Sequence, residues 1–99
     1  MPEHLRYRAT AIIVRDDEVL LVRDRGKHNF SLPGGAIRKG EPSTSVAARE
    51  VYEELGLNAL RITRLRDCDF KGSVNAHKVS LIEVDGQPHL RGHELEKFV

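Results

Sequence analysis

Residues 34–57 read GGAIRKGEPSTSVAAREVYEELGL, and this stretch decides the fold. Pro42 suits the first turn of a helix because its fixed φ matches helical backbone. Ser43 to Leu55 contains neither Gly nor Pro, and Gly56 can end a helix by adopting the left-handed conformation. The sequence therefore predicts a helix over 42–55, directly after a glycine-rich loop.

The predicted helix carries its acidic side chains on one face. At about 100° per residue, Glu50, Glu53 and Glu54 fall within one sector of the helix. The apolar residues centre on another sector, about 130° away: Ala48, Val51 and Leu55. The helix can therefore pack on a sheet while it holds three carboxylates at the edge of the core.

Two explanations fit three neighbouring carboxylates. They can form a solvated acidic face, at a cost of roughly a few tenths of a kcal/mol for each repelling pair. They can also bind a hard divalent cation, since Mg²⁺ and Mn²⁺ take oxygen ligands and often bridge carboxylates to phosphates. Gly34 and Gly35 favour the cation, because a loop without Cβ atoms can bring backbone groups up to a phosphate or a metal.

Together the loop and the helix resemble a known motif, the Nudix box. The matching pattern is Gly35, five residues, Glu41, seven residues, Arg49-Glu50-Val51, one residue, Glu53-Glu54, one residue and Gly56-Leu57. This pattern covers residues 35–57, and Leu32-Pro33-Gly34 before it is similar to the usual lead-in. The chain therefore resembles the Nudix hydrolase family, and within it the MutT type.

The resemblance implies an α/β (α+β) fold, a Nudix-type α/β/α sandwich around a mixed β-sheet. It also implies hydrolysis of a nucleoside diphosphate linked to some moiety X, with Mg²⁺ or Mn²⁺ as the cofactor. Carried onto this sequence, the metal ligands are three helix carboxylates and one loop carbonyl: Glu50, Glu53, Glu54 and Gly35. Arg49 would orient the carboxylates, and Glu41 would contribute through water.

Hydrolysis of a diphosphate also needs a group that accepts the proton of the attacking water. Metal ions held by carboxylates can neutralise phosphate oxygens and lower the pKa of a bound water. Within the box, the base could be Glu53 or Glu50. The resemblance also allows a base on a later loop, where Glu94 ranks first and Glu96 second, and Glu83 is less suitable because it falls in a predicted strand.

Residues between the second apolar run and the glycine loop are candidates for substrate binding. Arg23, Arg25 and Lys27 could contact phosphates, although a solvated loop explains them equally well. Phe30 stands where the family often has an aromatic residue and could stack on a base, or else pack at the hinge. Gly34 would let the backbone approach the substrate.

Outside the box, short apolar runs predict two β-hairpins. Tyr7 to Arg15 and Val19 to Val22 flank an acidic turn at Asp16-Asp17, and their lack of strict alternation predicts burial on both faces. Leu60 to Phe70 and Val74 to Val84 flank Lys71-Gly72 and predict the second hairpin. The resulting β-β-α-β-β order indicates an α+β or mixed α/β fold.

Length and composition restrict the function further. The 99 residues allow one domain, 1–99, and no apolar run approaches the about 18 residues of a membrane helix. The formal net charge of +1 provides no global field that would attract a nucleic acid polymer or a membrane surface. Cys68 is the single cysteine, which favours a reducing compartment, and no signal-peptide core begins the chain. We therefore expect a cytoplasmic enzyme acting on a small nucleotide.

The end of the sequence raises a separate expectation. Leu95 to Val99 reads as the start of a strand, whereas the resemblance implies a second long helix after it. The expected domain is therefore C-terminally incomplete, with the C-terminal helix lacking. Either the chain is part of a longer protein, which we favour, or two chains cover each other as a homodimer.

Three readings of the function stay open at this point. The first is a metal-dependent hydrolase of a nucleoside triphosphate or modified nucleotide. The second is a catalytically silent Nudix-like nucleotide-binding module, although such modules often lack box carboxylates that this sequence keeps. The third is an isoprenoid diphosphate isomerase, which would need a cysteine acid near the site, and no matching motif surrounds Cys68.

Overall fold

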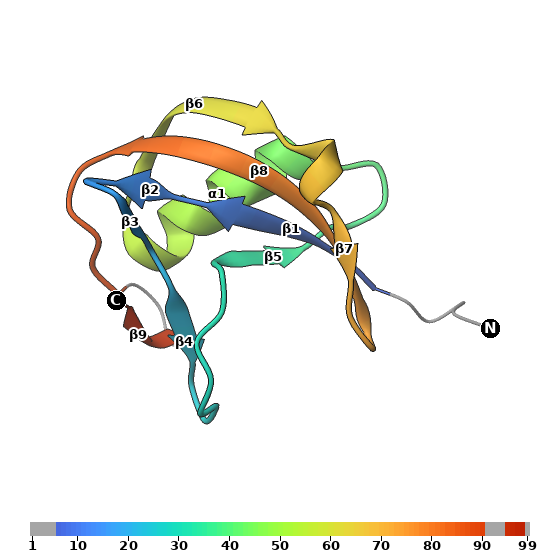
Figure 1. Ribbon diagram of the computed structural model, residues 1–99, viewed down its shortest axis with the longest axis horizontal. Coiled ribbons are helices and arrows are strands. Elements are labelled where there is room, and N and C mark those ends of the chain that lie inside the picture. Colours follow the sequence, from blue (N-terminus) through green and yellow to red (C-terminus); the bar gives the residue numbers. More distant parts are fainter. Residues whose placement is uncertain (1–5, 91–94, 99) are drawn as a thin grey trace.

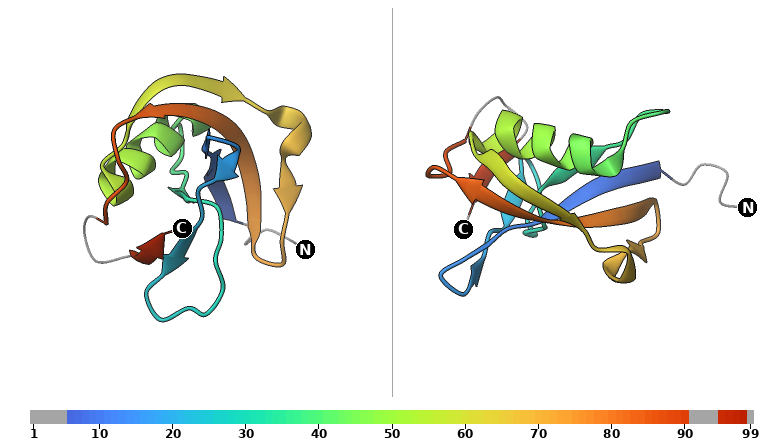
Figure 2. Two further views of the ribbon diagram at one scale, coloured as in Figure 1. Left: turned by 60° about the vertical axis from the view of Figure 1, so that its left-hand side comes forward. Right: turned by 90° about the horizontal axis from the view of Figure 1, so that it is seen from above.

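A single α-helix packs against one face of a mixed β-sheet in the computed structural model, which describes residues 6–90 and 95–98 (Figure 1). Viewed from above in Figure 2, the helix forms one layer and the strands form the other. The α+β architecture and the mixed sheet predicted from the sequence are confirmed. In this part of the chain, no helix has the length and apolar character needed to cross a membrane.

The helix, α1, spans Ser43–Leu55 and lies where the sequence predicted it. Pro42 is its N-cap, with extended backbone, so the helix begins one residue later than expected. Gly56 ends it with φ 69°, and the Gly56 N–H donates to the Tyr52 carbonyl at 2.9 Å. A side chain with a Cβ would be disfavoured in this left-handed conformation, which explains the glycine.

The main sheet has β5 and β6 at its edges and two central strands that come from opposite parts of the sequence. Its five strands are β1 (Arg6–Ile12), β5 (Gly34–Ala36), β6 (Asn58–Arg64), β7 (Phe70–Lys71) and β8 (Asn75–Asp85). The order is β5-β1-β8-β6, with β7 also paired to β8. The β1–β8 pair is parallel, with Tyr7 opposite Ala76, and the other pairs are antiparallel.

The predicted first hairpin is confirmed at its turn, but its strands are shorter than expected. Asp16 and Asp17 have φ of 54° and 63°, and they join β2 (Val14–Arg15) to β3 (Glu18–Val19). Aspartate tolerates such backbone better than most residues. The chain then departs from the hairpin, because β4 (Val22–Asp24) pairs antiparallel with β9 (Leu95–Phe98). The strand expected at Leu95 is therefore present.

The prediction that the first hairpin is buried on both faces is wrong at the tip of the hairpin. Val14 and Val19 pair across the hairpin, and each is 47% exposed. The apolar runs that include them are continuous in sequence, but only β1 enters the core of the main sheet. Each of these two valines is therefore only about half covered by the described chain.

The two faces of the main sheet differ in character. Ala9 and Ala11 of β1 are fully buried beside α1 and Ile82, in the core cluster of the molecule. Because side chains alternate along a strand, Arg8 and Thr10 point to the other face. The parallel register sets Arg8 opposite His77, so β8 continues this polar face. The sheet thus has an apolar layer under the helix and an opposite face of mixed character, on which Thr10 and Val79 are also buried.

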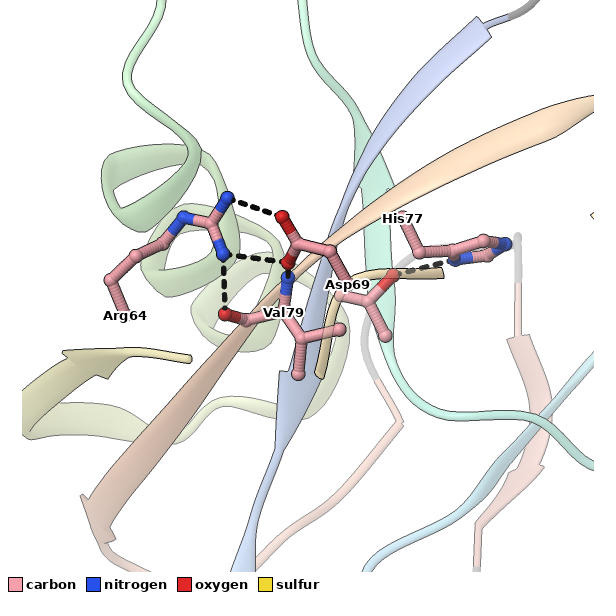
Figure 3. A network of polar contacts seen from close by, with 5 residues as sticks. Arg64, Asp69, His77 and Val79 are labelled. Carbon is pink, nitrogen blue, oxygen red and sulfur yellow. Dashed lines mark hydrogen bonds and ion pairs between the residues drawn. The ribbon is translucent and has the colours of Figure 1, made fainter. Parts of the chain in front are cut away.

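The second predicted hairpin is confirmed, with an interruption that the sequence did not reveal. Between β6 and β7 the chain forms a short 3₁₀ helix, η1 (Arg66–Cys68), and Asp69 follows it. Asp69 accepts two hydrogen bonds from Arg64 at 2.7 Å, and a third from the Val79 N–H at 2.8 Å (Figure 3). Arg64 also donates to the Val79 carbonyl at 3.0 Å. This network fixes the start of β7 against β8.

Asp69→Asn should lower the stability of the protein near neutral pH by about 1 kcal/mol, or several degrees in Tm. The Arg64 hydrogen bonds, helped by the Val79 N–H, lower the pKa of Asp69 from 3.8 to about 2. A carboxyl with a lowered pKa stabilises the fold above its unfolded-state value and loses that effect as the pH falls through the folded-state value. Thermal melts should therefore show a gap between wild type and variant that narrows from pH 4 to pH 2. A constant gap would contradict this account.

Candidate active site

The C-terminal half of α1 and the glycine loop border a cavity of about 650 Å³. We call it the carboxylate cavity. Its lining combines two acids of α1, a third acid from β4, four arginines and the loop backbone: Glu50, Glu54, Asp24, Arg8, Arg25, Arg38, Arg49, Gly34, Gly35 and Ala36. Opposite charges thus converge on one hollow at the edge of the sheet.

The helix brings only two of its three predicted carboxylates into this cavity. Glu54 is 7% exposed, and the Glu50 side chain is 18% exposed. The Glu53 side chain is 57% exposed and is not part of the cavity lining. The three residues share a helical sector, but β5 lies against the part of that sector that carries Glu50.

Gly35 allows the loop to lie directly on Glu50. A Cβ atom at position 35 would stand 2.6 Å from Glu50 Cγ and 2.7 Å from Glu50 Oε1. Real Cβ atoms do not approach that closely, so any larger residue would displace the carboxylate. At Gly34, a Cβ would overlap the carbonyl oxygen of Ala9 in the neighbouring strand. Both glycines of the loop are therefore required by close packing.

Arg49 lies among three carboxylates at the rim of the cavity. It donates a 2.7 Å hydrogen bond to Glu41, and its guanidinium is 3.9 Å from Glu50 and 3.8 Å from Glu53. That hydrogen bond, with one from the Arg38 backbone N–H, lowers the pKa of Glu41 and raises the pKa of Arg49. Glu41 thus anchors the arginine at one end, and its other end faces the helix carboxylates.

The other predicted substrate residues divide between the cavity and its surroundings. Arg25 lines the cavity, whereas Arg23 and Phe30 are not among its lining residues. Instead the Arg23 guanidinium lies over the Phe30 ring, 5.8 Å from its centre. Glu94, the predicted later base, lies outside the described residues.

Two arginines of the cavity were not singled out from the sequence. Arg38 falls inside the box, between the glycine loop and Glu41, and its position in the motif was a usable signal. Arg8 comes from β1, where it alternates with buried Ala9. The strand also contains Arg6, so nothing in its sequence marked Arg8, and only the pairing of β1 with β5 brings Arg8 to the loop.

The donor set fits a divalent cation that also binds substrate. Glu50, Glu54 and the Gly35 backbone offer hard oxygen ligands, the type that Mg²⁺ and Mn²⁺ prefer. Within residues 6–90 and 95–98, no three His, Cys, Asp or Glu side chains gather closely enough to hold a metal ion by themselves. Mg²⁺ commonly takes only one or two protein carboxylates and completes its shell with water and phosphate oxygens. Two carboxylates beside four arginines suit that arrangement.

Comparisons with known proteins agree with this geometry. The family model described as NUDIX domain matches residues 5–98. The RNA pyrophosphohydrolase of Yersinia enterocolitica is 42% identical over 55 residues, covering 52% of this chain and 31% of that protein. This chain thus matches about a third of the length of the curated relative.

Solved structures resemble the chain over nearly its whole length. A protein from Chromobacterium violaceum, described as a nudix hydrolase family member, superposes with a TM-score of 0.84 at 36% identity. The match covers 100% of this chain and 63% of that one. The MutT NUDIX hydrolase from Burkholderia pseudomallei superposes with a TM-score of 0.82 at 29% identity, covering 98% and 82% of the two chains. With the family model matching almost every residue, the chain belongs to the Nudix family.

Proposed function

We propose that this protein is a metal-dependent hydrolase that cleaves the diphosphate linkage of a nucleoside diphosphate linked to another moiety. The default substrate is a nucleoside triphosphate or a modified nucleotide. The observation that carries the proposal is the meeting of Glu50 and Glu54 with a glycine loop and four arginines in one cavity. The RNA pyrophosphohydrolase and MutT relatives support the same reaction class.

The charges of the cavity suit a polyphosphate chain. Arg8, Arg25 and Arg38 would bind non-bridging phosphate oxygens, since guanidinium groups donate paired hydrogen bonds to phosphate. Their positive charges stabilise the negative charge that develops as the diphosphate bond breaks. Arg49, held by Glu41, would keep the helix carboxylates oriented.

Glu50 and Glu54, with the Gly35 carbonyl, would hold Mg²⁺ or Mn²⁺. When bound, the metal neutralises phosphate charge and lowers the pKa of water at the site. Glu53 is exposed beside Arg49 and would belong to the site through a water or once substrate is bound. For the proton of the attacking water, Glu53, Glu50 and Glu94 remain the candidate acceptors.

The cellular location, the domain organisation and the substrate class belong to this proposal as well. The described chain carries one cysteine, Cys68, which is exposed, as a reducing cytoplasm permits. We propose a single Nudix domain over 1–99 that acts on small nucleotides. Because one relative is an RNA pyrophosphohydrolase, RNA with a 5′-triphosphate joins the substrates to be tested.

A phosphate-release screen tests the proposed activity. The panel comprises nucleoside triphosphates, modified nucleotides, ADP-ribose, dinucleoside polyphosphates and 5′-triphosphate RNA, each with Mg²⁺ and with Mn²⁺. We expect turnover of at least one class, and its loss when a chelator removes the metal. Nucleotide binding without any turnover would instead identify a catalytically silent module.

Activity should rise from acid to mildly alkaline pH. Metal ligation needs ionised carboxylates, and the attacking water must lose a proton. The hydrogen bond from Arg49 lowers the pKa of Glu41, so this anchor keeps its charge to lower pH than a free glutamate would. The profile of kcat/KM is measured at saturating metal. A maximum near pH 5 would contradict the proposed chemistry.

A further inference from the structure

The chain that follows β8 passes the C-terminal end of α1 (Figure 1). We call residues 86–90 the strap. The His89 N–H donates a 3.0 Å hydrogen bond to the carbonyl of Leu55, the last residue of the helix. The last carbonyls of a helix have no partner within the helix, so this bond satisfies a group that would otherwise depend on water. The strap is thus attached to the end of α1.

The imidazole of His89 makes a second contact at the same place. A Cβ atom built on Gly56 would stand 2.7 Å from His89 Nε2 and would overlap His89 Cε1, so the ring lies directly on the glycine. Position 56 therefore needs a glycine for a second reason besides its φ of 69°. The backbone of His89 holds Leu55, and the side chain of His89 covers Gly56.

The other end of the strap is attached to the first hairpin. Arg15 of β2 donates two hydrogen bonds, each of 2.8 Å, to the Gly86 carbonyl. Between the two attachments, Gln87 and Pro88 border a hollow of about 500 Å³. Packing along the strap is incomplete there, so its two ends carry the attachment, and His89 is the end that holds the helix.

The turn that the strap holds is the one that carries Glu54. Glu54 directly precedes Leu55, and its side chain lines the carboxylate cavity. Helix ends open locally at little cost in free energy, because few contacts are lost when they do. A carboxylate on such a turn leaves its position whenever the turn opens. Glu50 lies one turn earlier and packs against the loop at Gly35, so it does not depend on the strap.

We propose that His89 is a positioning residue for Glu54, which keeps the buried carboxylate in the carboxylate cavity by clamping the last turn of α1. The inference deepens the proposed function and rests on it where it takes Glu54 to be a metal ligand. His89 lies outside the box and is not among the lining residues of the cavity, so it acts through Glu54.

A spectroscopic test follows the carboxylate itself, without metal. Glutamate side chains are labelled with ¹³C, and the carboxyl resonance of Glu54 is compared in wild type and His89→Ala. Because His89 is exposed, its truncation should leave the core intact. Loss of the ring should shift the Glu54 resonance toward those of exposed glutamates and leave the Glu50 resonance in place. An unchanged Glu54 resonance would overturn the inference, and so would equal shifts of Glu50 and Glu54, which indicate general loosening.

The second measurement is the affinity for Mn²⁺, followed through the EPR signal of the free ion. His89→Ala should bind Mn²⁺ about 10- to 100-fold more weakly, the loss found when a group that orients a metal ligand is removed. His89→Phe keeps a flat ring over Gly56 and should restore most of the affinity.

Gln87→Ala is the matched control from the same strap. It keeps the backbone, and none of the contacts with α1 described above comes from the Gln87 side chain. This variant should bind Mn²⁺ like wild type. Equal affinities of His89→Ala and Gln87→Ala would overturn the inference.

The outcomes separate this inference from the proposed hydrolase. A wild type that binds no Mn²⁺, but in which His89→Ala shifts the Glu54 resonance alone, loses the proposed metal-dependent activity and keeps the positioning role of His89. A wild type that binds Mn²⁺ with an affinity that His89→Ala leaves unchanged keeps the proposed activity and loses that role.

Discussion

Glu54→Gln should lower turnover at least about a hundredfold, as losses at a metal site can. Glutamine has the shape of glutamate but lacks the charge, so the variant removes the proposed metal ligand without opening a hole. Glu54 is 7% exposed and reaches the carboxylate cavity from the last turn of α1. An uncharged side chain at a buried position should leave the metal-free protein at least as stable as wild type.

A pair of melting curves makes this test specific to the metal. Mg²⁺ or Mn²⁺ at millimolar concentration should raise the Tm of the wild type, because a ligand that binds only the folded state stabilises it. The same ions should leave the Tm of Glu54→Gln unchanged. Glu18→Gln, an exposed acid on β3, serves as the control and should behave like wild type. If Glu54→Gln turned over substrate as fast as wild type at low metal concentration, the assignment of Glu54 as a metal ligand would be wrong.

Gly35→Ala should reduce activity by about a hundredfold while leaving the fold largely intact. The new methyl group would meet Glu50 Cγ and Oε1, which belong to a side chain that can swing away from the loop. The carboxylate then leaves its position, and a displacement of about 1 Å at a reactive site can cost a hundredfold in rate. Gly72→Ala is the control, because a Cβ there would meet only one atom, at 3.8 Å.

A double-mutant cycle identifies the mechanism of that loss. If Gly35→Ala acts by displacing Glu50, then adding Glu50→Ala should cost little more, because the carboxylate is already out of place. Independent roles would instead give multiplied losses. The measured quantity is kcat/KM for the four proteins of the cycle, with melts to verify folding. Multiplied losses would mean that the loop and the carboxylate act separately.

Local chemistry made the helix and its loop predictable. Pro42 and Gly56 mark the ends of α1 through their own backbone preferences, and Asp16-Asp17 marks a tight turn in the same way. Pairing between distant strands was not predictable on this basis. Nothing near Gly34 indicates that it will form a strand with β1, and nothing in β1 indicates its parallel partner.

The site shows the same division between local and distant effects. Helical spacing placed Glu50, Glu53 and Glu54 in one sector, but the rotation of α1 against β5 turns Glu53 toward solvent. That rotation depends on which apolar residues the sheet accepts, and it is a property of the assembled core. The stacking of Phe70 on another ring was not predictable, because a lone aromatic residue near a turn has no spacing that reveals its partner. Its partner His77 becomes its neighbour only through the β7–β8 register.

The parallel pairing of β1 with β8 has a consequence for how the protein is made. During synthesis, β1 leaves the ribosome well before its partner strand β8, since Tyr7 lies opposite Ala76. The helix and most of the other strands are made in between. Until β8 is made, β1 and α1 lack the β8 side of the apolar layer that both help to form. Closing so long a loop costs chain entropy before any contact rewards it, which slows folding. The nascent chain therefore remains vulnerable to aggregation until β8 emerges. Mutations in β8 that change the Tm of the folded protein only slightly should still lower the yield of folded protein in cells.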